Sequence, residues 1–255
     1  MMPGRETLAW RLKVGLGVAV VLFGGWEILG QLGRLDPLLF AWPSAILKAL
    51  GEMVVGADYW QDVRASGIEL LAGFGIALFG VPIGLMLGYW RTFAEYLDPL
   101  FNALYSTPSV ALTPLFVIWF GLGLQSKVAL SALMGIFPVL INTAAGVKGV
   151  DRSLLYAARS FGASEYRILR GVILPATLPF VMTGVRLGLG RSLIGAIIGE
   201  MISSNKGLGH LILTTAQNFQ TAAYFAALGS VMIVAWLCIE VIRLLEVRWV
   251  PWQRS

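Results

Sequence analysis

The chain has 255 residues, of which 57% are apolar and only 13% are charged. Soluble domains carry about 25% charged residues, so this composition, with a mean hydropathy of +0.77, excludes an ordinary soluble protein and indicates a membrane protein. The single cysteine excludes a disulfide framework and a thiolate metal site, and the formal net charge of +5 is typical of basic cytoplasmic loops rather than of nucleic-acid binding.

Apolar runs long enough to cross a bilayer, at about 20 residues each, recur along the chain. They predict an all-α polytopic membrane protein with six transmembrane helices, at residues 12–31, 68–89, 103–120, 127–145, 178–200 and 224–246. The first run has a basic flank like that of a signal peptide, but it is too long and no small-x-small cleavage site follows, so we expect it to remain as an anchor. A single transmembrane domain is therefore expected over 12–246, between terminal segments 1–11 and 247–255.

The connection over residues 32–67 contains the helical pattern PSAILKALGEMVVG, and we expect this helix to lie on the outer surface. Two of the predicted spans carry glycines at intervals of four, namely Gly80, Gly84 and Gly88 in the second and Gly184–Gly188 and Gly195–Gly199 in the fifth. Small residues let helix backbones approach closely, so these two spans are expected at the centre of the bundle, unless the glycines only reflect their frequency in membrane helices. Pro82, Pro114 and Pro138 lie inside apolar runs and predict bends.

The distribution of lysine and arginine predicts the orientation of the spans. With the N-terminus in the cytoplasm, twelve of these residues fall in inside segments: Arg5, Arg11, Lys13, Arg91, Lys148, Arg152, Arg159, Arg167, Arg170, Arg243, Arg248 and Arg254. Five fall outside: Arg34, Lys48, Arg64, Lys127 and Lys206. This bias favours a chain with both termini in the cytoplasm.

Residues 146–177 are cytoplasmic in this orientation and contain the basic stretch YAARSFGASEYRILRGVILP. Its pattern predicts two short helices separated by Gly162, with Ser164 as the cap of the second and Leu174-Pro175 as the end of the unit. Apolar residues form one face of each helix, namely Leu154, Leu155, Ala158 and Phe161 in the first and Ile168, Leu169 and Val172 in the second. Such a unit either docks into a groove of another protein or lies on the membrane, and periodicity leaves both open.

Ionisable residues inside membrane spans are costly, which makes them candidates for function. Those identified are Glu27, Arg186, Arg191, Glu200 and Glu240. Arg186 is close enough to the inner end of its span to reach it, whereas Arg191 is deeper and can bind a carboxylate, sulfonate or nitrate through paired hydrogen bonds. Alternatively, Arg191 pairs with Glu27 or Glu240 or contacts helix carbonyls. Glu200 lies at the outer end, before glycines that suit a tight turn in an outer gate.

The basic stretch resembles the cytoplasmic-loop signature of ABC importer permeases, which reads Glu-Ala-Ala, three residues, Gly, nine residues, Ile-x-Leu-Pro. The matching residues, at the same spacings, are Ala157, Ala158, Gly162, Leu174 and Pro175. Tyr156 replaces the usual Glu, so no salt bridge is expected from that position, and Val172 replaces Ile. The stretches ALTPLFVIWFGLGLQSK (111–127) and GEMISSNKGLGHLI (199–212) resemble the branch that serves nitrate, sulfonates, taurine and related small solutes.

The resemblance covers most of the chain from about residue 66 and implies the type I ABC importer permease fold, in the inner (plasma) membrane of a bacterial cell. It implies a second copy of the chain, two separate ATP-binding subunits that hold ATP and Mg, an extracytoplasmic solute-binding protein, and lipid as the surrounding partner. The implied ATPase-coupling residues lie in the 146–177 loop: Ala157, Ala158, Arg159, Gly162, Leu174 and Pro175. The translocation-pathway candidates are Arg186, Arg191 and Glu200.

No nucleotide site is expected in this chain itself. The nearest match to a phosphate loop, GLGLQSK at 121–127, lacks the glycine before its lysine and lies between spans, so we expect a non-catalytic subunit with no cofactor or metal of its own. The alternative function is a gradient-driven secondary transporter or channel, for which paired intramembrane carboxylates or an internal repeat would be expected. A membrane enzyme is disfavoured because His210 is the single histidine and no Ser/His/Asp or HExxH pattern is present.

Overall fold

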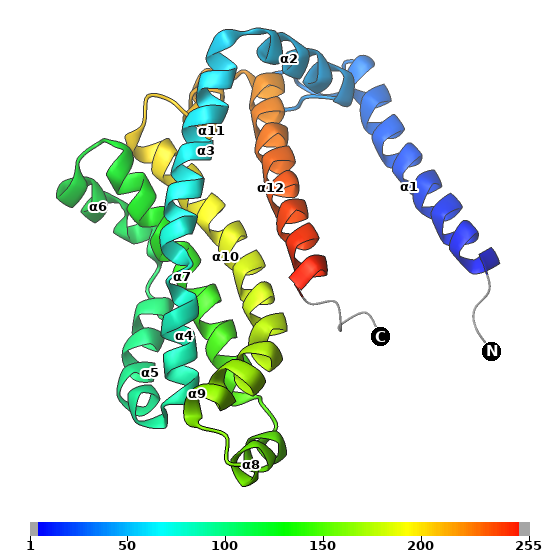
Figure 1. Cartoon of the computed structure of the whole chain (residues 1–255). Helices are drawn as coiled ribbons and strands as arrows, with labels where there is room; N and C mark the ends of the chain where they lie inside the picture. Colours follow the sequence, from blue (N-terminus) through cyan, green and yellow to red (C-terminus); the bar gives the residue numbers. More distant parts are fainter. Residues whose placement is uncertain (1–4, 250–255) are drawn as a thin grey trace. The chain divides into compact units, whose positions relative to one another are not determined.

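The computed structural model describes residues 5–249, and every regular segment in that range is a helix (Figure 1). The ends of the predicted terminal segments, residues 1–4 and 250–255, lie outside the described residues. The chain divides into two compact units, one formed by Met1–Gln61 with Leu211–Ser230 and the other by Asp62–His210 with Val231–Ser255. The prediction of an all-α membrane protein is confirmed.

The first unit contains α1 (Arg5–Gln31), α2 (Pro43–Val55), most of α11 (Leu208–Gln217) and the start of α12 (Thr221–Trp249). Helix α2 is the helix predicted from the pattern in the first long connection. Its start is held to α1 because the Ser44 amide and hydroxyl both donate to the Glu27 carboxylate, at 2.9 and 2.6 Å. Glu27 is therefore a local structural residue, since Gln31 binds the same carboxylate at 2.7 Å.

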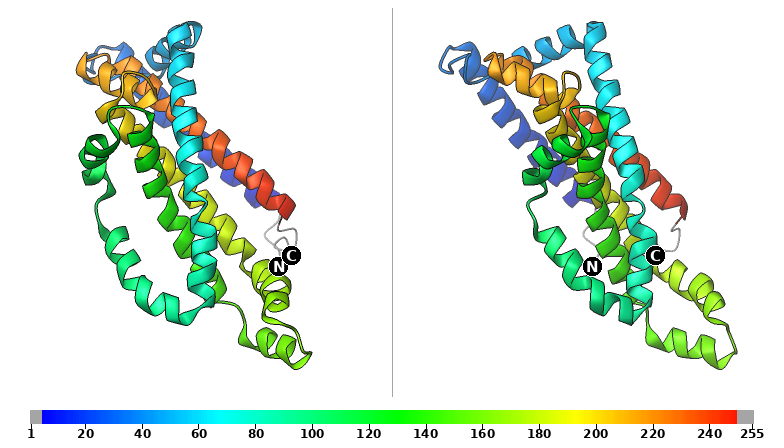
Figure 2. Two further views of the ribbon diagram at one scale, coloured as in Figure 1. Left: turned by 60° about the vertical axis from the view of Figure 1, so that its left-hand side comes forward. Right: turned by 90° about the vertical axis from the view of Figure 1, so that its left-hand side faces the viewer.

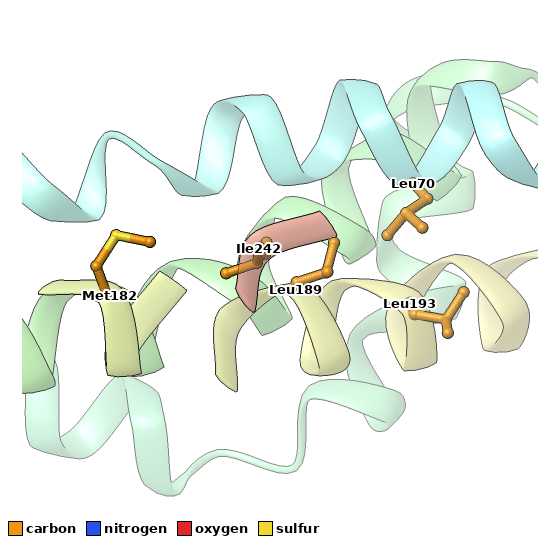
Figure 3. Close-up of a cluster of buried hydrophobic side chains, with 5 residues drawn as sticks. All are labelled: Leu70, Met182, Leu189, Leu193 and Ile242. Atoms are coloured by element: carbon orange, nitrogen blue, oxygen red, sulfur yellow. The ribbon is translucent and has the colours of Figure 1, made fainter. Parts of the chain in front are cut away.

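The second unit contains most of α3 (Ala57–Ala77) and then α4 (Gly80–Tyr89), α5 (Arg91–Ser106), α6 (Thr113–Phe120), α7 (Leu124–Lys148), α8 (Arg152–Ser160), α9 (Glu165–Ile168) and α10 (Leu174–Ser203). Helix α7 carries the longest run of buried residues in this unit, and both α4 and α10 pack along it (Figures 1 and 2). A second contact joins α3, α10 and the end of α12 through Leu70, Met182, Leu189, Leu193 and Ile242 (Figure 3). These contacts form the core of the bundle.

The predicted glycine rows lie at helix contacts, which confirms their packing role. A Cβ at Gly84 would lie 2.5 Å from the Leu140 carbonyl oxygen, and one at Gly195 would lie 2.8 Å from Ser131 Cα, both on α7. The two glycine-bearing spans were predicted to form the centre of the bundle. Instead, both pack against the fourth span, α7, which is the central helix. The spacing of the glycines shows which face of a helix lacks side chains, but it does not show which neighbouring helix packs on that face.

Replacing Gly195 by valine is expected to lower the free energy of unfolding by about 1–3 kcal/mol, because the added side chain meets backbone that cannot move aside. Thermal unfolding of the detergent-solubilised protein measures the loss. Valine at Gly75, a helical glycine whose added Cβ has no atom within 4 Å, is the matched control. Equal loss at both positions would show that helix propensity, rather than packing against α7, sets the cost.

The third predicted span, 103–120, is not one helix. Helix α5 ends at Ser106, a 3-10 turn follows at Ser109–Leu112, and α6 begins at Thr113, so that the two halves meet at 83°. Pro108 explains the break, because it lacks an amide donor and disfavours helical backbone at the residue before it. Among the described residues, five helices are long and apolar enough to cross a membrane, and this bent pair makes a sixth if it counts as one span.

The remaining predicted bends have different outcomes. Pro82 follows an interruption of the second span, because α3 ends at Ala77 and α4 begins at Gly80, and proline has no amide to donate to the carbonyl four residues earlier. Pro138 lies inside α7, whereas Pro114 lies in the first turn of α6. A proline in the first turn lacks a donor that the helix would leave unpaired in any case, so it starts a helix rather than bending one. The second span is also longer than predicted, since α3 and α4 together run over Ala57–Tyr89.

Candidate functional site

The 146–177 loop is built from two short helices, as predicted, and α8 projects beyond the ends of α7 and α10 (Figures 1 and 2). Asp151 caps α8 by accepting a hydrogen bond from the Ser153 amide at 2.8 Å. That backbone hydrogen bond, with one from the Ser153 side chain, holds the pKa of Asp151 below its ordinary value. The Asp151 side chain therefore stays ionised to a lower pH than an ordinary aspartate, and it loses its charge only when the pH falls through this lowered pKa.

Gly162 ends α8 in a backbone conformation that favours glycine, with φ at +73°. The Gly162 amide donates to the Arg159 carbonyl at 2.9 Å and the Ala163 amide donates to the Ala158 carbonyl at 3.1 Å. These two bonds form the Schellman motif, in which a left-handed residue satisfies the last carbonyls of a helix. A Cβ at Gly162 would meet no atom within 4 Å, so the requirement for glycine comes from the backbone and not from crowding within the chain.

The second helix of the loop departs from the prediction in two ways. Ser164 occupies the cap position, but its side chain makes no capping bond, and Glu165 instead binds Tyr89 and, at 3.3 Å, Arg159. Leu174-Pro175 does not end the unit, because α9 continues through a π-helical turn at Leu169–Ile173 directly into α10. Proline is accepted there because it falls in the first turn of α10. The loop is thus joined rigidly to a long helix.

One side of the loop packs on the bundle and the other is exposed. Ile168 and Ile173 are buried with Val147 and Val150, and Leu155 and Ala158 pack against this cluster. The predicted apolar face of α8 is only half correct, because Leu154 is 51% exposed and Phe161 is 91% exposed. Tyr156 and Tyr166 are also exposed, so the loop presents aromatic side chains away from the bundle. The implied coupling residues Ala157, Arg159, Gly162, Leu174 and Pro175 are exposed, and Ala158 is half-buried.

The charges of the predicted spans are mostly paired. Arg186 pairs with Glu246 of α12, and Glu240 pairs with Arg243 one turn later on the same helix. Arg191 makes no hydrogen bond or ion pair with any described residue of its own compact unit, and the Glu240 carboxylate is occupied by Arg243. The Arg191 side chain is exposed and lines a cavity of about 370 Å³ between the end of α5, the 3-10 turn, α7 and α10.

A buried charge cluster lies where α3, α7 and α10 meet the turn before α11. The Lys127 ammonium lies 2.5 Å from Glu69 Oε1 and donates to Ser204 Oγ at 2.9 Å. Glu200 is fully buried and accepts a hydrogen bond from the Gly209 amide at 2.6 Å, with Ser66 and Glu69 beside its carboxyl group. Glu69 Oε2 and Glu200 Oε1 have no hydrogen-bond partner among the described residues. We call Glu69, Lys127 and Glu200 the buried charge cluster.

Of the buried charge cluster, Glu200 was predicted from the sequence as a candidate, whereas Glu69 and Lys127 were not. Glu69 lies within the predicted span 68–89. Because a carboxylate inside a membrane span is costly, its position could have marked it as a candidate functional residue. Lys127 was assigned to the outside segments because it begins the fourth span, and its position gave no sign of burial. In the structure Glu200 is 0% exposed and does not line the cavity that contains Arg191, and Arg186 does not line it either.

Known proteins are similar to this chain in sequence and in fold. Residues 80–250 match the family described as binding-protein-dependent transport system inner membrane component. A protein of Bacillus subtilis (strain 168) named as an aliphatic sulfonates transport permease, SsuC, is 34% identical over 257 residues, which cover 99% of this chain and 91% of that protein. The taurine transport system permease protein TauC of Escherichia coli (strain K12) is 34% identical over 254 residues, covering 97% and 92%. An inward-facing MetNI methionine ABC transporter matches the fold with a TM-score of 0.58 at 21% identity, over 75% of this chain and 95% of the matched chain.

Proposed function

We propose a transport function for this chain, which belongs to the family of binding-protein-dependent transport system inner membrane components, the ABC transporter permeases. The chain forms the translocation pathway of an ATP-driven importer in the inner membrane of a bacterial cell, with both termini in the cytoplasm. A second copy of the chain completes the pathway, two separate ATPase subunits supply the energy, and an extracytoplasmic solute-binding protein delivers the solute.

The observation that carries this proposal is the geometry of the 146–177 loop. An exposed short helix docks best when its own backbone is fixed beforehand, because less conformational entropy is then lost on binding. Here the Schellman motif at Gly162 fixes the end of α8, and burial of Ile168 and Ile173 fixes the second helix. The exposed Phe161 and Tyr156 supply apolar surface for a protein partner. We therefore assign the loop to contact with the ATPase.

The same geometry explains how movement of the ATPase would reach the pathway. Helix α10 continues from the loop without a break and carries Arg191 near its middle. A displacement of α8 and α9 is transmitted along this helix, because a packed helix moves as a rigid element. The loop residues Ala157, Ala158, Arg159, Gly162, Leu174 and Pro175 are the proposed coupling residues.

The solute is proposed to be a small anion such as a sulfonate, taurine or nitrate. Two relatives named for sulfonate or taurine transport support this assignment, and so does Arg191, an arginine without an ion-pair partner among the described residues. Of the three pathway candidates, Arg191 is the one that lines a cavity. Arg186 and Glu200 are assigned instead to the ion pair with Glu246 and to the buried charge cluster.

ATP hydrolysis tests the proposal directly. The purified chain in nanodiscs is expected to hydrolyse no ATP, because its sequence contains no phosphate-binding loop, and to form a complex that hydrolyses ATP once the separate ATPase subunit is added. Release of inorganic phosphate is the measurement, and ATPase alone is the control. Hydrolysis by the chain alone, or uptake into vesicles that needs an ion gradient and no ATP, would overturn the proposal in favour of another class of transporter.

A further inference from the structure

The cavity that contains Arg191 is lined by this one cation, by hydroxyl-bearing residues and by apolar side chains. Resting on the proposed function, we propose that this cavity recognises a small organic anion that combines a compact oxyanion head with a short aliphatic body, as in an alkanesulfonate. The same cavity discriminates against an analogue that carries an ammonium group. The relatives are named for aliphatic sulfonate transport or for taurine transport, and taurine differs from an alkanesulfonate by its ammonium group.

The head of such an anion has three suitable donors. The Arg191 guanidinium offers N–H groups in a planar fork, and no described residue uses them. Ser109 and Tyr105 also line the cavity, and no described residue hydrogen-bonds to either hydroxyl. The hydroxyls of Ser106 and Thr107 instead donate to the Asn102 and Ala103 carbonyls, at 2.7 and 3.0 Å. Arg191, Ser109 and Tyr105 are therefore the groups available to an oxyanion.

Other residues that line the cavity are apolar. Val110, Met134, Phe137 and Pro138 line it, and Phe137 and Pro138 are themselves buried. A body of two or three carbons placed there removes apolar surface from water, which strengthens binding by roughly fourfold per methylene group. Nitrate has no such body. An alkanesulfonate has both an oxyanion for the donors and an aliphatic body for the apolar side chains.

An ammonium group has no matching partner in this cavity. None of the lining residues is Asp or Glu, and Arg191 would repel a second cation. The oxygens of Ser106 and Thr107 are neutral acceptors, and they do not offset the loss of water around an ammonium. The cavity therefore discriminates by leaving the ammonium group of the amino compound unpaired, and not by making tighter contacts to the alkanesulfonate.

The position of Arg191 shows that this face of the chain is not covered by lipid. Arg191 is 12 residues from Ser203 and 17 from Leu174, which puts it about 18 Å and 26 Å from the two ends of α10. An exposed, unpaired guanidinium at that depth is not stable against hydrocarbon, so a water-filled pathway or a second copy of the chain must adjoin it. The cavity is thus on the side of the chain where a solute would pass.

The test is binding of small anions to the full-length chain in nanodiscs, alone and in complex with the ATPase, observed by ligand NMR at millimolar concentration. Propane-1-sulfonate is expected to bind roughly 15-fold more tightly than methanesulfonate, which lacks two of its methylene groups. 3-Aminopropane-1-sulfonate is expected to bind more than about tenfold more weakly than propane-1-sulfonate, because its ammonium has no partner. Equal binding of the amino compound, or no binding of either sulfonate, overturns the inference.

Arg191→Gln replaces the guanidinium by a shorter, neutral amide and is expected to weaken propane-1-sulfonate binding by roughly 10- to 100-fold. The matched control is the double variant Arg186→Gln with Glu246→Gln, which removes an arginine five residues earlier on α10 together with its partner. It is expected to bind like the wild type. Unchanged binding in Arg191→Gln overturns the inference, and so does equal weakening in the control.

The outcome for this inference is separable from that for the proposed function. A complex that hydrolyses ATP and associates with its ATPase, but whose chain binds no sulfonate, overturns the inference and leaves the importer assignment intact. A chain that binds propane-1-sulfonate through Arg191 but neither associates with an ATPase nor depends on ATP supports the anion site and contradicts the importer.

Discussion

Replacing Lys127 by methionine is expected to lower the free energy of unfolding by about 3–5 kcal/mol, the cost of leaving a buried charge without its partner. The Lys127 ammonium is 2.5 Å from Glu69, and the side chains are only 8% and 3% exposed, so water does not replace the lost cation. Two buried carboxyl groups, those of Glu69 and Glu200, would then remain together without it. Denaturant or thermal unfolding of the solubilised protein, together with its abundance in the membrane, measures the effect.

Two further variants decide whether the loss comes from the charge cluster. Adding Glu69→Gln to Lys127→Met removes one of the uncompensated carboxylates and is expected to recover a large part of the stability, since neutral replacement of a buried pair costs less than breaking it. Lys48→Met is the control for the substitution itself, because the Lys48 and Glu52 side chains are 80% and 69% exposed and such pairs contribute little. A double variant as unstable as Lys127→Met alone would contradict the proposed pairing.

Valine at Gly162 is expected to abolish most uptake while leaving insertion and membrane abundance unchanged. The wild-type φ of +73° is unfavourable for a β-branched residue, at a cost of about 1–3 kcal/mol, which corresponds to roughly 5- to 150-fold in a docking equilibrium. The cost falls on the end of α8 and not on the bundle, because a Cβ at this position meets nothing within the chain. Co-purification of the ATPase and ATP-dependent uptake into vesicles are the measurements.

Asparagine at Gly162 is the matched control, because it tolerates left-handed backbone far better than valine does. If the conformation alone matters, Gly162→Asn retains ATPase association that Gly162→Val loses. If both variants insert normally and both lose the ATPase, the contact with the ATPase requires that residue 162 has no side chain. If Gly162→Val associated fully with the ATPase and transported at the wild-type rate, the assignment of the 146–177 loop to ATPase coupling would be wrong.

Much of this fold follows from local sequence signals. Membrane spans are set by runs of apolar residues, so α1, α7, α10 and α12 fall close to their predicted positions. The ends of short helices are set by nearby residues, so the break at Gly162 was readable from the stretch itself. The helix-contact glycines were also readable, because their spacing of four places them on one face of a helix.

Other features are invisible to local signals. The bend after Ser106 was missed because Pro108 lies inside a run whose hydropathy is high enough for a straight span. The predicted closing role of Leu174-Pro175 failed because proline is equally acceptable as the first turn of a new helix. The sequence near Pro108 is compatible with a straight or a bent span, and Leu174-Pro175 is compatible with the end or the start of a helix. The packing of neighbouring segments selects one structure in each case.

Hydropathy, helix periodicity and motif spacing are properties of neighbouring residues, so a helical membrane permease with a basic two-helix loop between its fourth and fifth spans can be read from the sequence alone. The pairing of charges, in contrast, is visible only in the folded chain. Lys127 meets Glu69 across 58 positions of sequence and Arg186 meets Glu246 across 60, while Arg191 meets no described partner. The physical reason is that desolvation and Coulomb attraction depend on distances in space, which are fixed only when α3, α7, α10 and α12 pack.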